Sequence, residues 1–189
     1  SKIDRTHEVT EKEFSVSFNS TSKMYRGGPY AIRKDIWEAS DKINIPIKFF
    51  DSNESPTSAF GTTKKFPLLP QGKQFEISDK IILYKSMFNI CPENNDDENF
   101  SQRLIDCFIN KTIPIYKGYK NIHEHFNREG MIIVKDGEDA INKINQLTPD
   151  YYNKRLGAIE DNYKRCLLNQ YHLSPGDRIS NKIKKIYGV

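Results

Sequence analysis

The sequence predicts one α/β domain built on a Rossmann-like parallel sheet with helices on both faces. Segments with strand character alternate along the chain with segments whose apolar residues recur at helical spacing. The run Met131-Ile132-Ile133-Val134 is apolar throughout, which is typical of a parallel strand buried on both faces. The length of 189 residues fits a single domain of this kind.

The first half of the chain predicts two strands around one helix. Residues 13–18 alternate apolar and polar side chains, as a half-buried strand does, and residues 46–50 form a second strand. Gly27-Gly28-Pro29 interrupts the chain between them. Residues 51–75 contain three prolines and two glycines, which indicates a long loop of the functional kind. The helix is predicted from apolar residues spaced by four, three and four positions: Ile32, Ile36, Ala39 and Ile43.

The second half continues the alternation and ends in helices. The apolar run at 131–134 predicts a strand, and residues 150–171 indicate one long helix. The other predicted segments are a short helix at 77–84, a strand at 87–91, a helix with Phe100, Leu104 and Phe108 on one face, a strand at 112–116, one or two helical turns at 121–126, and a helix with Ala140, Ile141, Ile144 and Leu147 on one face. We therefore divide the chain into an extension at 1–12, the Rossmann-like domain at 13–172, and a basic tail or helix at 173–189.

Composition excludes several classes of protein. Aromatic residues make up 12% of the chain, which is too many for a disordered protein. The net charge of +4 is small and both signs are spread throughout, so we expect no nucleic-acid partner. No apolar run approaches the roughly 18 residues of a membrane span, and no signal peptide is recognisable. The odd number of cysteines, three, favours a reducing, cytoplasmic location over a disulfide framework.

Parallel sheets bind ligands beyond the carboxyl ends of their strands, so the chemistry is expected in the loops after Phe18, Cys91 and Tyr116. The loop after Cys91 leads into a predicted helix whose first turns carry Arg103. Free backbone N–H groups at a helix start attract phosphate, and a guanidinium there can grip a diphosphate through paired hydrogen bonds. Glu93, in the same loop, is suited to accept hydrogen bonds from sugar hydroxyls.

This helix start also fits a purely structural explanation. Asn99-Phe100-Ser101-Gln102 matches a capping box, in which Asn99 caps the helix and the Gln102 side chain returns to the Asn99 N–H. Arg33 has a similar pair of explanations. It follows the Gly27-Gly28 loop by about one helical turn and can face a phosphate, or it is a solvated charge on a helix surface.

The stretch His123-Glu124-His125 suggests a metal site at first sight. His123 and His125 stand two positions apart, so their side chains diverge on a helix, unlike the pair four apart in zinc proteases. We expect no metal ligands in this chain. Cys107 lies on an apolar helical stripe and is expected in the core.

The stretch from residue 84 to residue 134 resembles the donor-binding half of GT-B glycosyltransferases, of the α-1,3-fucosyltransferase and exostosin-like kind. The residues that carry the resemblance are Phe88-Asn89-Ile90-Cys91-Pro92-Glu93-Asn94, Phe100-Ser101-Gln102-Arg103-Leu104-Ile105-Asp106-Cys107-Phe108, Thr112-Ile113-Pro114-Ile115-Tyr116-Lys117-Gly118 and Asn121-Ile122. The family pattern has a Glu-Asn pair after the strand, Glu-Lys in the helix start, and Pro-Ile-Tyr-x-Gly in the next strand.

The resemblance implies an enzyme of glycan biosynthesis that transfers a sugar from a nucleotide sugar, such as a GDP- or UDP-sugar, to a glycan or other hydroxyl acceptor. Such enzymes are typically inverting and need neither metal nor cofactor. By the same resemblance, the donor contacts are Arg33, Glu93, Asn94, Ser101, Gln102, Arg103 and Gly118. Arg103 stands in place of a phosphate-binding Lys, and Gln102 in place of a Glu that contacts the ribose.

The resemblance also implies a second Rossmann-like domain in a longer chain, because GT-B enzymes place the acceptor site and the usual catalytic base there. We name no catalytic base in this sequence. Two departures, Asn99 for Tyr and Gln102 for Glu, favour the alternative of a non-catalytic carbohydrate- or partner-binding module that retains the fold. The basic tail offers a contact with a membrane surface or with a partner.

Overall fold

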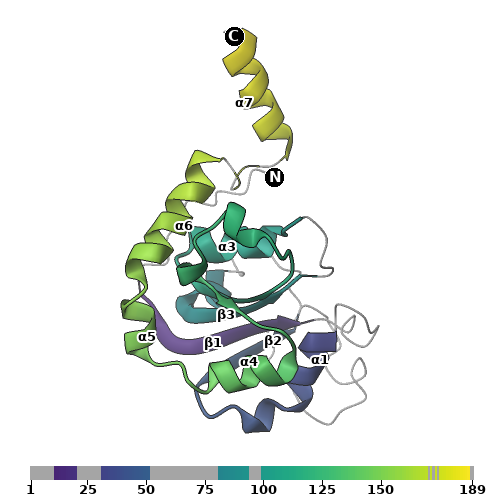
Figure 1. The fold of residues 1–189 in the computed structure, drawn as a ribbon, viewed down its shortest axis with the longest axis vertical. Coiled ribbons are helices and arrows are strands. Elements are labelled where there is room, and N and C mark those ends of the chain that lie inside the picture. The colour runs from purple at the N-terminus through teal and green to yellow at the C-terminus, as the bar shows by residue number, and fades with distance from the viewer. Residues whose placement is uncertain are drawn as a thin grey trace.

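The computed structural model describes residues 11–20, 31–51, 81–93, 99–169, 171, 173 and 175–187 (Figure 1). Within these residues, a parallel sheet of five strands is covered by helices on both faces. This confirms the predicted fold class. The strands are β1 (Glu13–Ser20), β2 (Ile47–Asp51), β3 (Ser86–Pro92), β4 (Ile113–Lys117) and β5 (Ile132–Ile133).

The strand order is β2-β1-β3-β4-β5, and every neighbouring pair is parallel. From β1 the chain passes outward to β2, then returns to the other side of β1 to form β3. The direction of winding therefore reverses between β1 and β3. In open parallel sheets such a reversal leaves a crevice at the carboxyl ends of the two strands, where ligands bind.

The helices form one layer on each face of the sheet. Helices α1 (Ala31–Glu38) and α4 (Gly137–Ile144) pack together on one side, and α3 (Gln102–Ile109) packs with α6 (Leu156–Leu168) on the other (Figure 1). Helix α5 (Pro149–Asn153) leads into α6, and short 3-10 turns occur at 40–42, 81–85, 122–124 and 128–130. Helix α7 (Pro175–Tyr187) extends away from the domain (Figure 1).

Each face of the sheet buries its own hydrophobic core. Val16, Phe88 and Ile115 face α1 and α4, whereas Cys91 and Tyr116 face α3 and α6. Alternate residues of a strand point to opposite faces, so a strand buried on both sides needs apolar residues at both. This explains why β3 and β4 carry apolar residues on both faces.

Three predicted segments differ from the observed elements. The helix predicted to include Ala39 and Ile43 ends at Glu38 and is followed by the 3-10 turn at 40–42. The run 131–134 forms a strand of only two residues at the edge of the sheet, where Ile133 is half-buried, because no further described strand pairs beyond it. The long helix predicted at 150–171 is broken at Lys154 and Arg155 into α5 and α6. The break lets Tyr152 of α5 pack into the α1–α4 core while Cys166 of α6 packs into the α3–α6 core.

The boundaries proposed for the extension and the tail stay predictions. Lys12 is tied to the domain, since its ammonium donates to the Tyr84 carbonyl, to the Asn110 carbonyl and to the Thr112 hydroxyl. Helix α7 exposes Ile179 and Ile186 together with several lysines. Of the helices in the described part of the chain, none has both the length and the apolar content needed to span a bilayer.

Candidate functional site

The candidate site lies where β1 and β3 end side by side, at the reversal of the sheet. Strand β3 ends at Pro92, and the chain turns there so that Glu93 N donates to the carbonyl of Lys117 at the end of β4, at 2.7 Å. The carbonyl oxygen of Pro92 accepts hydrogen bonds from side chains of two helices, α1 and α3. Long polar side chains from both helices meet at this carbonyl.

Arg33 and Arg103 converge on it. Arg33 Nη2 donates to Pro92 O at 2.5 Å, and Arg103 Nη2 donates to the same oxygen at 3.2 Å. Two nitrogens that share one acceptor at these distances lie within about 6 Å of each other, where like charges repel. Both guanidinium groups are charged at any physiological pH. The arrangement concentrates positive charge at the crevice.

The two arginines differ in exposure. Arg33, one turn into α1, is 5% exposed, whereas the Arg103 side chain on the first turn of α3 is 37% exposed. The solvated-charge explanation of Arg33 is therefore wrong, because the side chain is buried against the end of β3. The helix face that carries Arg33 is fixed by its neighbours Ile32 and Ile36, which pack into the core.

Glu93 fastens the start of α3 to the end of β3. Its side chain is 4% exposed, and its Oε1 accepts the backbone N–H of Ser101 at 2.9 Å. Its Oε2 lies 3.8 Å from Arg103 Nη2. A carboxylate at a helix start satisfies a free N–H and interacts favourably with the helix dipole. Glu93 thus positions the first turn of α3, which carries Arg103, through its hydrogen bond to Ser101 and its charge beside the guanidinium.

The capping box is not formed. Helix α3 begins at Gln102 with Ser101 as its N-cap residue, and the Ser101 side chain makes no capping hydrogen bond. Gln102 Nε2 donates instead to Asp106 Oδ1, one turn along the exposed face of the helix, at 3.1 Å. The box fails because Glu93, a residue distant from the tetrapeptide, supplies the carboxylate.

Two buried polar atoms beside the crevice have no hydrogen-bond partner within the described part of the chain. They are Ser101 Oγ, at the N-cap of α3, and Asn19 Oδ1, at the end of β1. Buried polar atoms without a partner are costly, so they mark places where a polar ligand is favourable. Sequence analysis missed Asn19. The signal that could have found it was its position at the carboxyl end of the first strand.

Gly118 belongs to the site through packing. A Cβ atom on this residue would lie 2.5 Å from Glu93 Cγ and 2.6 Å from the Tyr116 hydroxyl oxygen, which is too close for any side chain. The Tyr116 hydroxyl in turn accepts the backbone N–H of Tyr119. The glycine is therefore required so that the buried Glu93 can reach α3. The remaining predicted contact, Asn94, lies outside the described residues.

Other chemically active groups lie away from the crevice or are inert. In the described ranges, no group of three or more His, Cys, Asp or Glu side chains could hold a metal ion. His125 packs in a cluster of aromatic rings with Phe100 and Tyr171. Burial raises the pKa of the Cys107 thiol well above its usual value, and that of Cys166 to about 12, so neither is a thiolate nucleophile.

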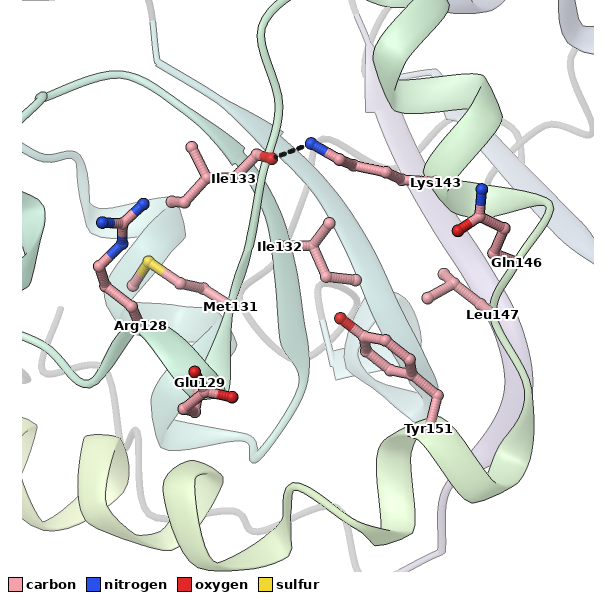
Figure 2. Close-up of a pocket in the computed structure, with 9 residues that line it drawn as sticks. All are labelled: Arg128, Glu129, Met131, Ile132, Ile133, Lys143, Gln146, Leu147 and Tyr151. Atoms are coloured by element: carbon pink, nitrogen blue, oxygen red, sulfur yellow. Dashed lines mark hydrogen bonds between the residues drawn. The ribbon is translucent and has the colours of Figure 1, made fainter.

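A hollow lined by described residues is a different feature. It measures about 490 Å³ and lies beyond the edge strand β5, between Ile132, Leu147 and Tyr151 (Figure 2). Lys143 Nζ donates to the Ile133 carbonyl on this edge at 2.9 Å (Figure 2). A lysine on an unpaired strand edge discourages pairing with another strand. This hollow is mostly apolar and is separate from the crevice.

Comparison with known proteins bears on the fold. No protein-family model matches the sequence, and no curated protein matches it. The chain is similar to a crystal structure of an α1,3-fucosyltransferase with GDP-fucose, with 21% identity and a TM-score of 0.52, over 77% of this chain and 38% of that chain. It is also similar to T4 phage BGT in complex with its UDP-glucose substrate, with 13% identity and a TM-score of 0.55, over 93% of this chain and 49% of that chain.

These likenesses establish the class of fold. The chain has the Rossmann-like fold of one half of a GT-B glycosyltransferase. It spans less than half the length of either of those structures.

Proposed function

We propose that this chain is the nucleotide-sugar-binding domain of a glycosyltransferase, with Arg33 and Arg103 as the residues that bind the donor diphosphate. The observation that carries the proposal is the convergence of both guanidinium groups on the Pro92 carbonyl, at the reversal of a parallel sheet. A diphosphate offers several charged oxygens and the bidentate geometry that guanidinium prefers.

The local backbone supports the same ligand. Helix α3 starts beside the arginines, and the first N–H groups of a helix include some that have no partner within the helix and can bind an anion. Ser101 Oγ adds a hydroxyl that lacks a partner in the described part of the chain. Arginines, helix start and hydroxyl together are complementary to an anion with several acceptor oxygens.

The proposed reaction is inverting transfer of the sugar to a hydroxyl of a glycan or similar acceptor. As the bond from the sugar to the diphosphate breaks, negative charge grows on the leaving phosphate oxygens. The two guanidinium groups stabilise that charge electrostatically, which is the role a divalent cation plays in other enzymes. The proposal is therefore metal-independent transfer. The base that deprotonates the acceptor, and the acceptor site itself, are assigned to a second Rossmann-like domain of a longer chain.

The neighbours support a nucleotide-sugar ligand but leave its identity open. One was solved with GDP-fucose and another with UDP-glucose. The narrower assignment to the α1,3-fucosyltransferase or exostosin-like families stays a prediction. A second candidate function is a non-catalytic binding module. The bond from Gln102 to Asp106 favours it, since this side chain is engaged along the helix and carries no carboxylate.

The test is calorimetric titration of the chain with GDP, UDP and their sugar conjugates, together with thermal unfolding. Ligand at about 100 times its dissociation constant adds roughly 2.7 kcal/mol of stability, which corresponds to about 5–10 °C in Tm for a chain of this size. Arg103→Ala should remove the shift. The matched control is Arg165→Ala on α6, because Arg165 is ion-paired and 39% exposed, close to the exposure of Arg103. Equal shifts in the parent and Arg103→Ala would refute the site.

Helix α7 is proposed to contact an anionic membrane surface. Its exposed isoleucines, Ile179 and Ile186, and its exposed lysines combine an apolar and a basic surface, which is the composition of interfacial helices.

A further inference from the structure

A stripe of polar side chains runs along β1 toward the crevice. Its first two members, Ser15 and Ser17, are buried, although the helix-covered core beside them is apolar. Ser15 Oγ donates to Ser86 Oγ at 2.8 Å, and Ser17 Oγ accepts the side-chain amide of Asn89 at 2.7 Å. Each of these two hydroxyls therefore has a partner on the neighbouring strand β3.

Contacts with neighbouring elements place this stripe on the α3 face of the sheet. Asn89 Oδ1 accepts the Cys107 thiol of α3 at 3.6 Å. Asn19 follows Ser17 by two positions in the same strand, so the two side chains point to the same face. The residue that pairs with Asn19 on β2 is Phe50, which belongs to the α3–α6 core. Asn19 is thus the last member of the stripe, at the carboxyl end of β1.

Asn19 differs from the other members in its hydrogen bonding. Its Oδ1 atom is buried and has no partner within the described part of the chain, although the residue as a whole is partly exposed. A buried acceptor without a partner costs stability. The last torsion of an asparagine side chain is broad, so the oxygen can turn toward the crevice, and it gives up no hydrogen bond to the described residues by doing so.

The chemistry of the amide oxygen defines what it can bind. It accepts hydrogen bonds, so it cannot pair with a phosphate oxygen, which is also an acceptor. In a nucleotide sugar the diphosphate joins two sugars, the ribose and the sugar that is transferred, and both carry hydroxyls. A neutral acceptor on the strand next to β3, where Arg33 and Arg103 meet at Pro92, therefore matches a hydroxyl close to the diphosphate.

We propose that the Asn19 side chain recognises the donor by accepting a hydrogen bond from a sugar hydroxyl, on the ribose or on the transferred sugar. The inference rests on the proposed function, because it takes the crevice as the donor site. Arg33 and Arg103 respond to the charge of any diphosphate. Asn19 adds selection, because a ligand without the hydroxyl leaves the amide oxygen without a partner.

The experiment compares the parent with Asn19→Leu, which keeps the approximate size of the side chain and removes the amide. Calorimetry measures binding of GDP and UDP, of their 2′,3′-dideoxy forms, and of GDP-mannose and UDP-glucose. If the hydroxyl is on the ribose, Asn19→Leu should weaken the nucleoside diphosphate about three- to tenfold. Its dideoxy form should then bind the variant at least as tightly as the parent. If the hydroxyl is on the transferred sugar, only the nucleotide sugar should weaken.

Thermal unfolding without ligand separates this role from a structural one. Asn19→Leu should retain the Tm of the parent, because the oxygen that it removes has no partner among the described residues and Phe50 beside it is apolar. Ser17→Ala is the matched control on the same face of β1. It should lower the Tm, since its hydroxyl is bonded to Asn89, and leave the ligand preference unchanged. Asn19→Ala repeats the comparison if leucine disturbs folding.

Three results would overturn the inference. The first is that Asn19→Leu and Asn19→Ala bind every ligand as tightly as the parent. The second is a lower Tm with unchanged affinities, which makes Asn19 a structural residue of the sheet. The third is an equal loss for the nucleoside diphosphate, its dideoxy form and its sugar conjugate, which excludes a sugar hydroxyl as the partner. These results leave the proposed function standing as long as the parent binds GDP or UDP through Arg103. If the parent binds neither nucleotide, both proposals are overturned.

Discussion

Glu93→Gln separates the two roles that Glu93 can have at this site. Glutamine keeps the shape of the side chain, and its amide oxygen can still accept the Ser101 N–H now bound at 2.9 Å. The substitution removes only the negative charge, which lies 3.8 Å from Arg103 Nη2. Since a charge-assisted hydrogen bond is roughly twice as strong as a neutral one, the free energy of unfolding should fall by about 1 kcal/mol.

The same change should strengthen binding of a diphosphate. A phosphate held by Arg103 would lie about 6 Å from the Glu93 carboxylate, where one pair of unit charges repels by about 1 kcal/mol at an effective dielectric constant near 50. Removing the carboxylate charge should therefore tighten GDP or UDP about fivefold. The variant is predicted to be less stable alone and to bind more tightly.

The assay pairs chemical unfolding without ligand with calorimetric titration of GDP and of a GDP-sugar. If Glu93 instead accepts hydrogen bonds from the donor sugar, as its sequence position suggested, the GDP-sugar should weaken in Glu93→Gln while GDP alone does not. Weaker binding of both ligands would refute the electrostatic reasoning. Asp106→Asn, which removes a charge farther along the same helix, controls for net charge.

Three further predictions concern packing, reactivity and pH. Gly118→Ala should cost about 2–4 kcal/mol of unfolding free energy and weaken nucleotide binding, because the new Cβ would displace the buried Glu93 side chain; unfolding in urea measures the loss. Cys107 should resist a thiol reagent in the native state and react only on unfolding, since burial raises its pKa; labelling with and without denaturant tests this. Hydrogen bonds from Arg165 and Asn127 lower the pKa of Asp161, so its stabilising contribution should be present above about pH 4 and be lost as the pH falls through the lowered folded value; Asp161→Asn should flatten that part of the acid unfolding curve.

The sequence predicted the sheet better than it predicted the ends of its elements. Strands β1, β3 and β4 are predicted by alternating apolar and polar residues or by continuous apolar runs. These patterns follow directly from which faces of a strand are buried. The break between α5 and α6 has no such signal. Lys154 and Arg155 are good helix formers, and the break at them accompanies the packing of Tyr152 and Cys166 into different cores.

At the site, too, the sequence predicted single residues but not the contacts between them. Arg33 and Arg103 were identified as candidates, but neither local pattern could reveal that both reach the Pro92 carbonyl. The capping box predicted at 99–102 is not formed, because Glu93 at the end of β3 accepts the Ser101 N–H at the start of α3. The hollow at the carboxyl ends of β4 and β5 could not be predicted from the sequence, since its cationic residues come from three separate segments with no spacing in common: Lys117 and Lys120, Arg128, and Lys135.

One variant distinguishes two roles of Arg33, which can bind a ligand or only tie α1 to β3. A buried guanidinium bonded to a carbonyl fits both roles, and Arg33→Ala should destabilise the chain in either case, by about 1–3 kcal/mol. The roles differ in what ligand restores. If Arg33 is only a tie, saturating nucleotide should raise the Tm of Arg33→Ala as much as that of the parent, because the ligand contacts are intact. If Arg33 holds the diphosphate, the shift should shrink in the variant, and Arg33→Lys should recover stability better than affinity, since lysine keeps the charge but lacks the planar fork.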